Sequence, residues 1–438
     1  MDLFNSILFW VDIGVIAVVL SVFLFQLIFG LLFFLPHRKY PKAKKIHDFT
    51  FIIRARNEED VIGDCIDSCL KADYPADKKH VIVFCHNCTD HTAEIAVKHG
   101  ARAVILTDHE PTHQKASYCM KLGMDELKKD PEGTYEYFLF IDADNQVDKN
   151  YLHAVNDAAD DGVDLGRTYE NSKNLTDNLL SCMTGLWYAR DDRFACSTRS
   201  ALRLGCVMNG CCSMVKAEYG LNWDAMSTSD DIEFTLNRLL KDKKKVEYIS
   251  EAILYEDQPT TMKDVFKRNT RMGNGLNKLY WTTGLKVYGE FWKSLFNPHV
   301  KWSMKMAYLD QYTNIAAIPT AFLCFVWFPL YFLYTFFWIG FQGPLMVAGI
   351  PFAITWQGLL ITVVIAASIC YLIPFWVQPL LSFLTERKKF IITKKSVMFW
   401  SLLLFPTFEI INGFAIIEGI FKKPKWAKLK RSTTKIKQ

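Results

Sequence analysis

The sequence predicts an α/β domain with a mainly parallel sheet, held between membrane-spanning segments. Between residues 48 and 145, short apolar runs alternate with segments of helical spacing, which is typical of a parallel sheet. Three apolar runs end in polar clusters, RARNEE, CHNCTD and DADN, and such sheets bind ligands beyond the carboxyl ends of their strands. No charged residue occurs from Gln311 to Thr385, so this block favours a lipid environment.

Three apolar blocks predict membrane segments. Residues 8–35 form a first span that is too long for the apolar region of a cleaved signal peptide. Residues 311–385 are long enough for two spans, with a turn near GFQGPLMVAG. A third block, residues 397–421, carries Glu409 and Glu418, and we expect a break near Pro406 that makes it a re-entrant or hairpin segment.

Basic segments predict the orientation. HRKYPKAKK follows the first span, TERKKFIITKK precedes the third block, and a basic tail closes the chain. Positively charged loops stay in the cytoplasm, so residues 36–310 should be cytoplasmic in a multi-pass protein of the plasma membrane. The net charge of +5 is concentrated in these flanks, where membrane lipids account for it, and no nucleic-acid partner is required.

The 12 cysteines are typical of a reducing cytosol rather than of a disulfide scaffold. Cys65, Cys69, Cys85 and Cys88 have a spacing similar to that of zinc ligands. Cys65 and Cys69 share a helix face whereas Cys85 lies in a strand, which disfavours a zinc site.

The elements of the domain follow from local patterns. The runs FTFII, HVIVFC, ARAVIL and YFLFI are predicted strands, and VIGDCIDSCLKA, HTAEIAVKHG and KASYCMKLGMDELKK are predicted helices. No G-x-G-x-x-G or G-K-[ST] pattern is present, so Rossmann dinucleotide binding and P-loop chemistry lack their phosphate-binding loops.

Asp142 and Asp144 follow the last of these strands. Alternate residues of a strand face the same side, so both carboxylates point into one space and repel each other. A divalent cation with oxygen ligands would relieve that repulsion. The alternative is a polar turn that closes the strand.

A second acidic cluster lies in STSDDIEF. Thr228 is the expected N-cap of a helix whose first turn holds Asp230, Asp231 and Glu233. The acids could simply complement the helix dipole. The functional interpretation is that the positive helix end keeps a carboxylate ionised and ready to accept a proton.

A basic helix face follows at Lys267, Arg268 and Arg271, whose spacing would let them hold a diphosphate. The alternative is a basic interfacial helix that rests on lipid headgroups.

In this order, the clusters resemble the motifs of membrane-embedded family-2 glycosyltransferases, which include cellulose, hyaluronan, chitin and poly-N-acetylglucosamine synthases. IIRARNEE is similar to P-A-x-N-E-E with Arg54 at the proline, and CHNCTDHTAEIA to D-N-C-T-D-x-T-A-E-I-A with His86 at the first aspartate. IDADNQV matches D-x-D, MNGCCSMVKAE resembles the acceptor loop, and SDDIEF resembles T-E-D-x-E-F. The segment that ends in Q-x-x-R-W corresponds to YEDQPTTMKDVFKRNTRMGNG, with Met272 at the tryptophan.

The resemblance implies a GT-A-type nucleotide-sugar-binding fold and an inverting transfer from a UDP-sugar. Asp142 and Asp144 would bind Mg²⁺ or Mn²⁺, and Asp231 would be the general base, with Asp230 as the first alternative. The implied nucleotide-sugar-binding residues are Ala55, Asn57, Glu58, His86, Lys115, Asp142, Arg268 and Arg271. The implied acceptor-binding residues are Gly210, Cys211, Cys212 and Met272.

The acceptor could be a growing β-linked polysaccharide, which we expect first, or a lipid or glycolipid that receives one sugar. The departures at Arg54, His86 and Met272 leave open a non-catalytic nucleotide sensor, scaffold or transporter. The predicted organisation is an N-terminal span, a cytosolic GT-A domain, amphipathic interfacial helices, a C-terminal transmembrane region and a basic cytosolic tail, at residues 1–36, 37–260, 261–310, 311–421 and 422–438.

Overall fold

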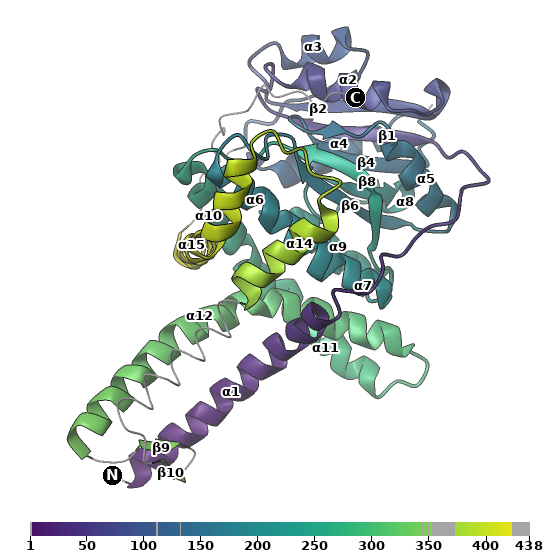
Figure 1. Ribbon diagram of the computed structural model, residues 1–438. Helices are drawn as coiled ribbons and strands as arrows, with labels where there is room; N and C mark the ends of the chain where they lie inside the picture. The colour runs from purple at the N-terminus through teal and green to yellow at the C-terminus, as the bar shows by residue number, and fades with distance from the viewer. Residues whose placement is uncertain are drawn as a thin grey trace.

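A computed structural model describes residues 2–110, 113–131, 133–342, 345–347, 350–352 and 373–422. An α/β body carries an eight-stranded sheet, and two long helices project from it (Figure 1). Most of the second span predicted within residues 311–385 lies outside the described residues.

The sheet has the strand order β3-β2-β1-β4-β7-β6-β8-β5. Strands β1 to β4 are mutually parallel, and β6 is parallel to β8, whereas β7 and β5 pair antiparallel with their neighbours. The mainly parallel α/β sheet is therefore confirmed, with all four predicted strands in place. The strands are β1 Phe49–Ala55, β2 Lys79–His86, β3 Arg102–Leu106, β4 Tyr137–Asp142, β5 Gln146–Val147, β6 Leu165–Ser172, β7 Ser213–Lys216 and β8 Glu247–Glu256.

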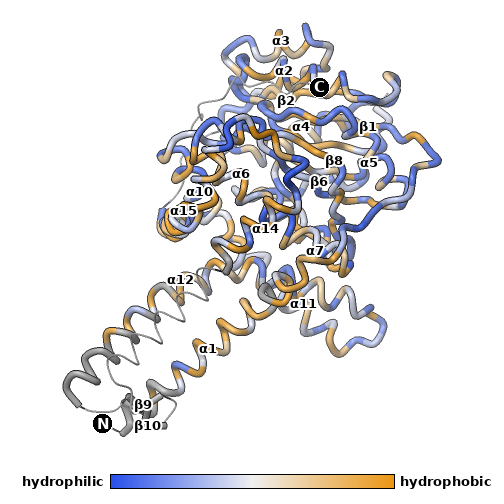
Figure 2. The backbone as a smooth tube through the Cα atoms, viewed as in Figure 1, coloured by the Kyte–Doolittle hydropathy of each residue, from blue (hydrophilic) through white to orange (hydrophobic). Residues whose placement is uncertain are grey.

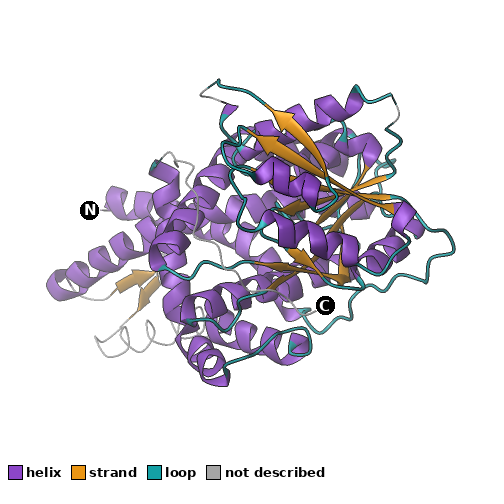
Figure 3. Ribbon diagram, turned by 90° about the horizontal axis from the view of Figure 1, so that it is seen from above, coloured by secondary structure: helices purple, strands orange, loops and turns teal. Residues whose placement is uncertain are grey.

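The central strands are apolar on both faces because helices cover both sides of the sheet (Figure 3). In β1, Phe51 and Ile53 face one core cluster, whereas the intervening Ile52 faces the other, as the alternation of a strand requires. The first cluster includes residues of α2 and α5, and the second includes residues of α4. These helices and α3 are α2 Ile62–Lys71, α3 Thr92–Lys98, α4 Ala116–Lys128 and α5 Tyr151–Asp160.

The second half of the body consists mainly of helices placed around β6, β7 and β8. These are α6 Leu179–Arg190, the π-helical η3 Asp191–Ser197, α7 Thr198–Ala201, α8 Ala217–Gly220 and α9 Asp230–Lys241. The chain then continues into α10 Met262–Leu279, η4 Tyr280–Gly284 and α11 Leu285–Leu295. In the first half, a short 3-10 helix, η1 Ala76–Lys78, precedes β2.

Helix α15 (Lys395–Phe421) packs along α10 and α6 against the body (Figure 1). Two glycines allow the close approach of α10 and α15. A Cβ atom on Gly273 would collide with the carbonyl oxygen of Ile416, and one on Gly419 would collide with that of Thr270. The segment before α15 contains η5 Ile373–Val377 and α14 Gln378–Glu386.

The break expected near Pro406 is wrong, because α15 runs as one helix through that residue. A proline removes one backbone hydrogen bond, and here the packing of the helix on α6 and α10 preserves the rest of the helix. Glu409, one of the two glutamates of this apolar block, pairs with Arg190 of α6 at 2.6 Å.

Helices α1 (Asp2–Leu31) and α12 (Trp302–Gln342) lie side by side and project from the body (Figure 1). Trp327 Nε1 of α12 donates a hydrogen bond to Asp12 Oδ1 of α1 at 3.0 Å. Figure 2 shows α1 as largely hydrophobic, and many of its apolar side chains are exposed, including Trp10 and Ile16, whereas Val15, Val22 and Phe29 are buried. A short hairpin follows α12, formed by β9 Leu345–Val347 and β10 Ile350–Phe352, near the predicted turn.

By length and composition, two helical segments of the described residues could cross a bilayer, Trp10–Leu31 and Lys395–Phe421. Signal sequences and buried core helices share these properties.

Candidate active site

The carboxyl ends of β1, β2 and β4 open into a cleft of about 530 Å³. These strands are parallel neighbours, so the polar residues that follow them lie at one edge of the sheet. Most of the residues that the sequence singled out line this cleft: Ala55, Glu58, His86, Lys115, Asp142, Asp144, Gly210, Cys211, Asp230, Asp231, Arg268, Arg271 and Met272.

Asn57 and Cys212 do not line the cleft. The backbone of Asn57 has a positive φ of 57°, and its side-chain oxygen accepts a hydrogen bond from Thr89 N at 2.8 Å. Asn57 therefore joins the loops after β1 and β2, and its contact with a nucleotide stays a prediction. Cys212 is fully buried, with a φ of 70°, so its side chain is not available to an acceptor.

Arg54 connects three of the predicted motifs. Its Nη2 lies 2.8 Å from Asp142 Oδ1 and 2.9 Å from the Gly210 carbonyl oxygen. Its Nη1 lies 3.3 Å from Asp230 Oδ2. The guanidinium therefore separates the carboxylate at the end of β4 from the acidic start of α9, which sequence reasoning did not predict.

A tight turn shapes the D-x-D segment. The side-chain oxygen of Asn145 accepts a hydrogen bond from Asp142 N at 2.6 Å. Lys173 is buried and donates from Nζ to the Asp144 carbonyl oxygen at 3.1 Å. Lys173 lies in a polar run just after β6, and no motif in this run pointed to a function.

The acids of α9 occupy its first turn, as predicted, but Ser229 rather than Thr228 is the N-cap. The chain before the helix is closed by Glu233, whose carboxylate accepts hydrogen bonds from Met226 N and Ser227 N at 2.8 and 2.7 Å. This loop closure moves the helix start to Asp230.

Burial changes the proton affinity of the α9 acids. Asp230 is buried, and burial together with the neighbouring charge of Asp231 raises its pKa to about 7, against the opposing effect of Arg54. Burial also raises the pKa of Asp231, which remains half-buried and lines the cleft. A Cβ atom on Gly210 would lie 3.6 Å from Asp231 Oδ2, so this carboxylate faces the predicted acceptor loop. The arrangement suits a group that accepts a proton near neutral pH.

Two basic residues of α10, Arg268 and Arg271, also line the cleft. Arg268 Nη1 donates to Gln258 Oε1 at 3.1 Å, and Nη2 lies 3.6 Å from Glu256 Oε2. The guanidinium also sits over the ring of Tyr188, 4.9 Å from its centroid. Glu256 and Tyr188 line the cleft and were not predicted.

At the nucleotide end, His86 is 3% exposed at the end of β2. Burial and the charge of Arg56 lower the pKa of its imidazole, so the ring is neutral at pH 7. A neutral imidazole offers one hydrogen-bond donor and one acceptor, whereas the aspartate expected from the resemblance offers only acceptors.

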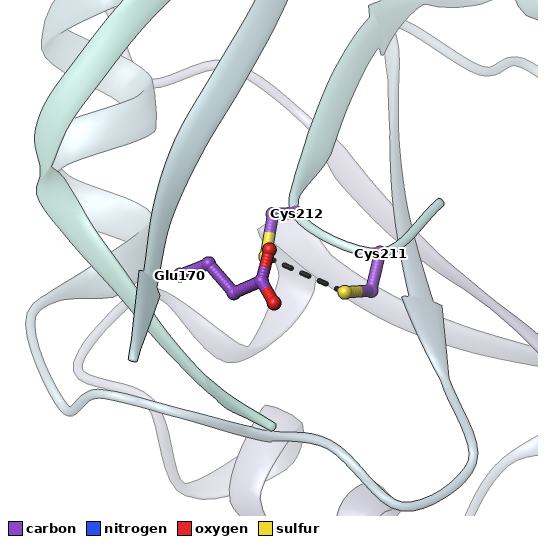
Figure 4. A group of neighbouring side chains, drawn as sticks. All are labelled: Glu170, Cys211 and Cys212. Carbon is purple, nitrogen blue, oxygen red and sulfur yellow. Dashed lines mark hydrogen bonds between the residues drawn. The ribbon is translucent and has the colours of Figure 1, made fainter. Parts of the chain in front are cut away.

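Below the acceptor loop, Glu170 lies beside Cys211 and Cys212, close enough for the three to suggest a metal site (Figure 4). The two sulfur atoms are 3.6 Å apart, and Asn209 donates a hydrogen bond to Glu170. Burial raises the pKa of Glu170 to about 8 and that of Cys212 to about 11, which leaves both protonated at neutral pH. A metal ion would have to displace both protons, which weakens its binding, so we interpret this cluster as buried support for the loop.

Zinc binding by the four cysteines weighed earlier gains no support. Cys65 lies beside Cys69, and Cys85 beside Cys88, but the four thiols form no common group among the described residues.

The cleft extends from its polar end to an apolar end. The lining there comes from α10, α12 and α15, through Leu276, Ile315, Ile318 and Ile416. The α12 helix that contributes to this end is also the helix that projects from the body with α1 (Figure 1).

Comparisons with known proteins agree with this architecture. The chain matches the family model described as Glycosyltransferase like family 2 over residues 47–275. It is 23% identical over 313 residues to the probable glycosyltransferase YdaM of Bacillus subtilis, covering 66% of this chain and 70% of that protein. The fold is similar to that of the mannosyltransferase PcManGT of Pyrobaculum calidifontis, solved with GDP-Man and Mn²⁺, with a TM-score of 0.51 and 14% identity over 92% of this chain and 97% of the other. The fold is thus GT-A-like, and the chain belongs to glycosyltransferase family 2.

Proposed function

We propose that this protein is a membrane-bound, inverting glycosyltransferase that moves a sugar from a UDP-sugar to an acceptor hydroxyl. The observation that carries the proposal is that two acidic sites in one cleft share a single arginine. A single guanidinium, that of Arg54, contacts both Asp142 and Asp230, at 2.8 and 3.3 Å. A strand-end acid and a helix-start acid this close could serve the two sides of one sugar.

The donor end fits a divalent cation. Asp142 and Asp144 are carboxylates that line the cleft, and hard cations prefer such oxygen ligands. These residues would hold Mg²⁺ or Mn²⁺, which when bound supplies positive charge that stabilises the departing diphosphate. PcManGT, whose fold is similar, was solved with Mn²⁺.

The remaining donor contacts come from side chains around the same end. Lys115, Arg268 and Arg271 would bind the diphosphate, because each brings a positive charge to the cleft. Glu58 and the backbone at Ala55 would contact the nucleoside. The neutral His86 would bind the edge of the base in place of a carboxylate.

Asp231 would remove the proton from the acceptor hydroxyl. The acceptor oxygen then attacks the anomeric carbon from the face opposite the departing diphosphate, and this single displacement inverts the centre. The raised pKa of Asp231 and its neighbour favours this role, because a base is most effective when its pKa lies near the working pH.

The acceptor site would be formed by Gly210, Cys211 and Met272, which line the cleft. Extension of a polysaccharide is the first interpretation. The apolar lining by Ile315 and Ile318 favours a second one, a lipid or glycolipid whose hydrocarbon part lies toward α12 while its hydroxyl reaches Asp231. Met272 has no flat ring on which a polymer could stack, which also favours the lipid acceptor.

The membrane location is supported by the projecting helices. The exposed side chains of α1 are largely apolar, and α12 runs beside it (Figure 2). We expect these two helices to enter the bilayer of the plasma membrane, with the catalytic body on the cytoplasmic side. We expect α15 to lie at the membrane surface, because it packs along α10 and α6 of the body. That placement would keep the basic tail cytoplasmic.

The test uses purified full-length protein in detergent with a panel of UDP-sugars and GDP-mannose, each with Mg²⁺ or Mn²⁺. We expect release of UDP from one UDP-sugar and its loss in Asp231→Asn. Sizing of the radiolabelled product separates the acceptors: a ladder indicates a polysaccharide, and a single mono-glycosylated lipid indicates the second interpretation. Binding of UDP without release from any donor would support a nucleotide sensor and contradict the proposal.

A further inference from the structure

The side chain of Arg54 makes contacts that a proline at this position could not make. It leaves β1 near the carboxyl end of the strand and reaches Asp142, Asp230 and the Gly210 carbonyl oxygen. The motif that this segment resembles has a proline there. The guanidinium is therefore an additional positive charge placed inside the donor end of the cleft.

A second cation lies against the same D-x-D segment. Lys173 is 5% exposed, and its Nζ lies 3.1 Å from the Asp144 carbonyl oxygen. Each aspartate of the D-x-D segment thus has a basic side chain beside it, Arg54 next to Asp142 and Lys173 next to Asp144. Neither of these two residues is implied as a site residue by the family resemblance.

The electrostatic free energy of binding at this site differs between a metal ion alone and a metal ion together with a diphosphate. The side chain of Asp142 is 37% exposed, so an ion in the cleft can reach it. The guanidinium at 2.8 Å neutralises part of the attraction and repels a second cation. A nucleoside diphosphate carries negative charges that offset this repulsion, so metal and diphosphate together are more favourable than metal alone.

We propose that Arg54 is a resident counter-ion of Asp142, which disfavours the divalent metal in the donor-free site and makes the metal enter together with the nucleotide diphosphate. Arg54 is a positioning residue in this scheme, because it acts through Asp142 and Asp230 and not on the sugar. The inference rests on the proposed function, since it assumes that Asp142 and Asp144 form the metal site.

The test measures Mn²⁺ binding directly. Free Mn²⁺ is followed by electron paramagnetic resonance during titration of full-length protein in detergent, with and without UDP. The variants are Arg54→Met, which removes the charge with similar length, and Arg54→Lys, which keeps the charge. Arg102→Met is the matched control, because Arg102 is an exposed arginine of β3 that pairs with Asp130. Circular dichroism and thermal unfolding check that each variant is folded.

We expect wild type to bind Mn²⁺ weakly alone and at least about tenfold more tightly with UDP, because the diphosphate adds negative charge at the site. Arg54→Met should bind Mn²⁺ alone at least about tenfold more tightly than wild type, because one repelling charge is gone. Arg54→Lys and Arg102→Met should stay close to wild type.

Equal affinity of wild type and Arg54→Met for Mn²⁺ alone, or weaker binding by the folded variant, would overturn the role of Arg54. If Arg54→Met does not fold, Arg54→Lys serves as the test, because it keeps the positive charge on a shorter side chain. Tighter binding of Mn²⁺ alone by Arg54→Lys would also contradict the inference. Wild type that binds no Mn²⁺ even with UDP would instead contradict the metal site of the proposed function.

Discussion

Two pairs of aspartates line the same cleft but differ in their surroundings. Asp142 and Asp144 follow the end of a strand, whereas Asp230 and Asp231 begin a helix. The side chain of Asp142 is 37% exposed and that of Asp230 is 9% exposed, although Arg54 contacts both. Asp142 therefore experiences water as well as the guanidinium, whereas Asp230 is buried with the same guanidinium beside a second acid.

The different surroundings allow aspartate to serve two roles in this cleft. An exposed strand-end carboxylate remains available to a cation that arrives with the donor. A buried carboxylate beside another acid holds a proton more tightly, so its pKa rises toward the pH at which a general base works. The first pair is suited to bind charge, and the second to move a proton.

The largest expected effect concerns the first pair. Asp144→Asn should abolish turnover, because the divalent cation loses a charged ligand next to the diphosphate. EDTA should have the same effect on wild type, measured as UDP release. Asp125→Asn is the control, since Asp125 is exposed on α4 and pairs with Lys128. Full activity in chelator would contradict the assignment of the metal site.

The second pair should separate binding from chemistry. Asp231→Asn keeps the shape of the side chain but cannot accept a proton, so we expect UDP affinity near that of wild type and transfer slower by about 10²-fold or more. Calorimetry with UDP and single-turnover kinetics measure the two quantities. A variant that keeps most of its rate would move the role of base to Asp230.

The smallest effect is on the pH dependence. The pKa of Asp230 is raised to about 7. Asp230 and Asp231 together must lose this proton before they can accept one from the acceptor hydroxyl. We therefore expect kcat/KM to rise as the pH increases through about 7. In Asp230→Asn, Asp231 loses a neighbouring negative charge, and the acidic limb should move to lower pH by about one unit. An unchanged limb in this variant would show that the two carboxyl groups do not titrate as a pair.

Much of the fold could be predicted because its signals are local. The apolar runs that became β1, β2 and β4 are continuous in the sequence, and parallel strands covered on both faces produce this pattern. The polar clusters that follow them meet in the cleft because parallel strands end at the same edge. The start of α9 was also predictable to within one residue, from its acids and its apolar face.

Other features depend on contacts between distant segments. Asn57 and Cys212 have motif positions typical of binding residues. In the structure the side chain of Asn57 is hydrogen-bonded to the neighbouring loop, and that of Cys212 is fully buried. Pro406 is a helix breaker by type, yet α15 continues because α6 and α10 support it. Lys173 carries no local signal, and Glu256 was not singled out within its motif; β6 and β8 bring both residues to the site.

The α/β class, the order of the motifs and the chemical identity of the two aspartate pairs could be predicted from the sequence, because each depends on residues close together in the chain. Tertiary structure alone decided that Arg54 lies between those pairs and that burial raises the pKa of Asp230. It also decided that the cleft continues to apolar residues of α12 and α15. Charge interactions and burial act through space, between residues that lie far apart in the chain; Arg54 and Asp230, for example, are 176 positions apart.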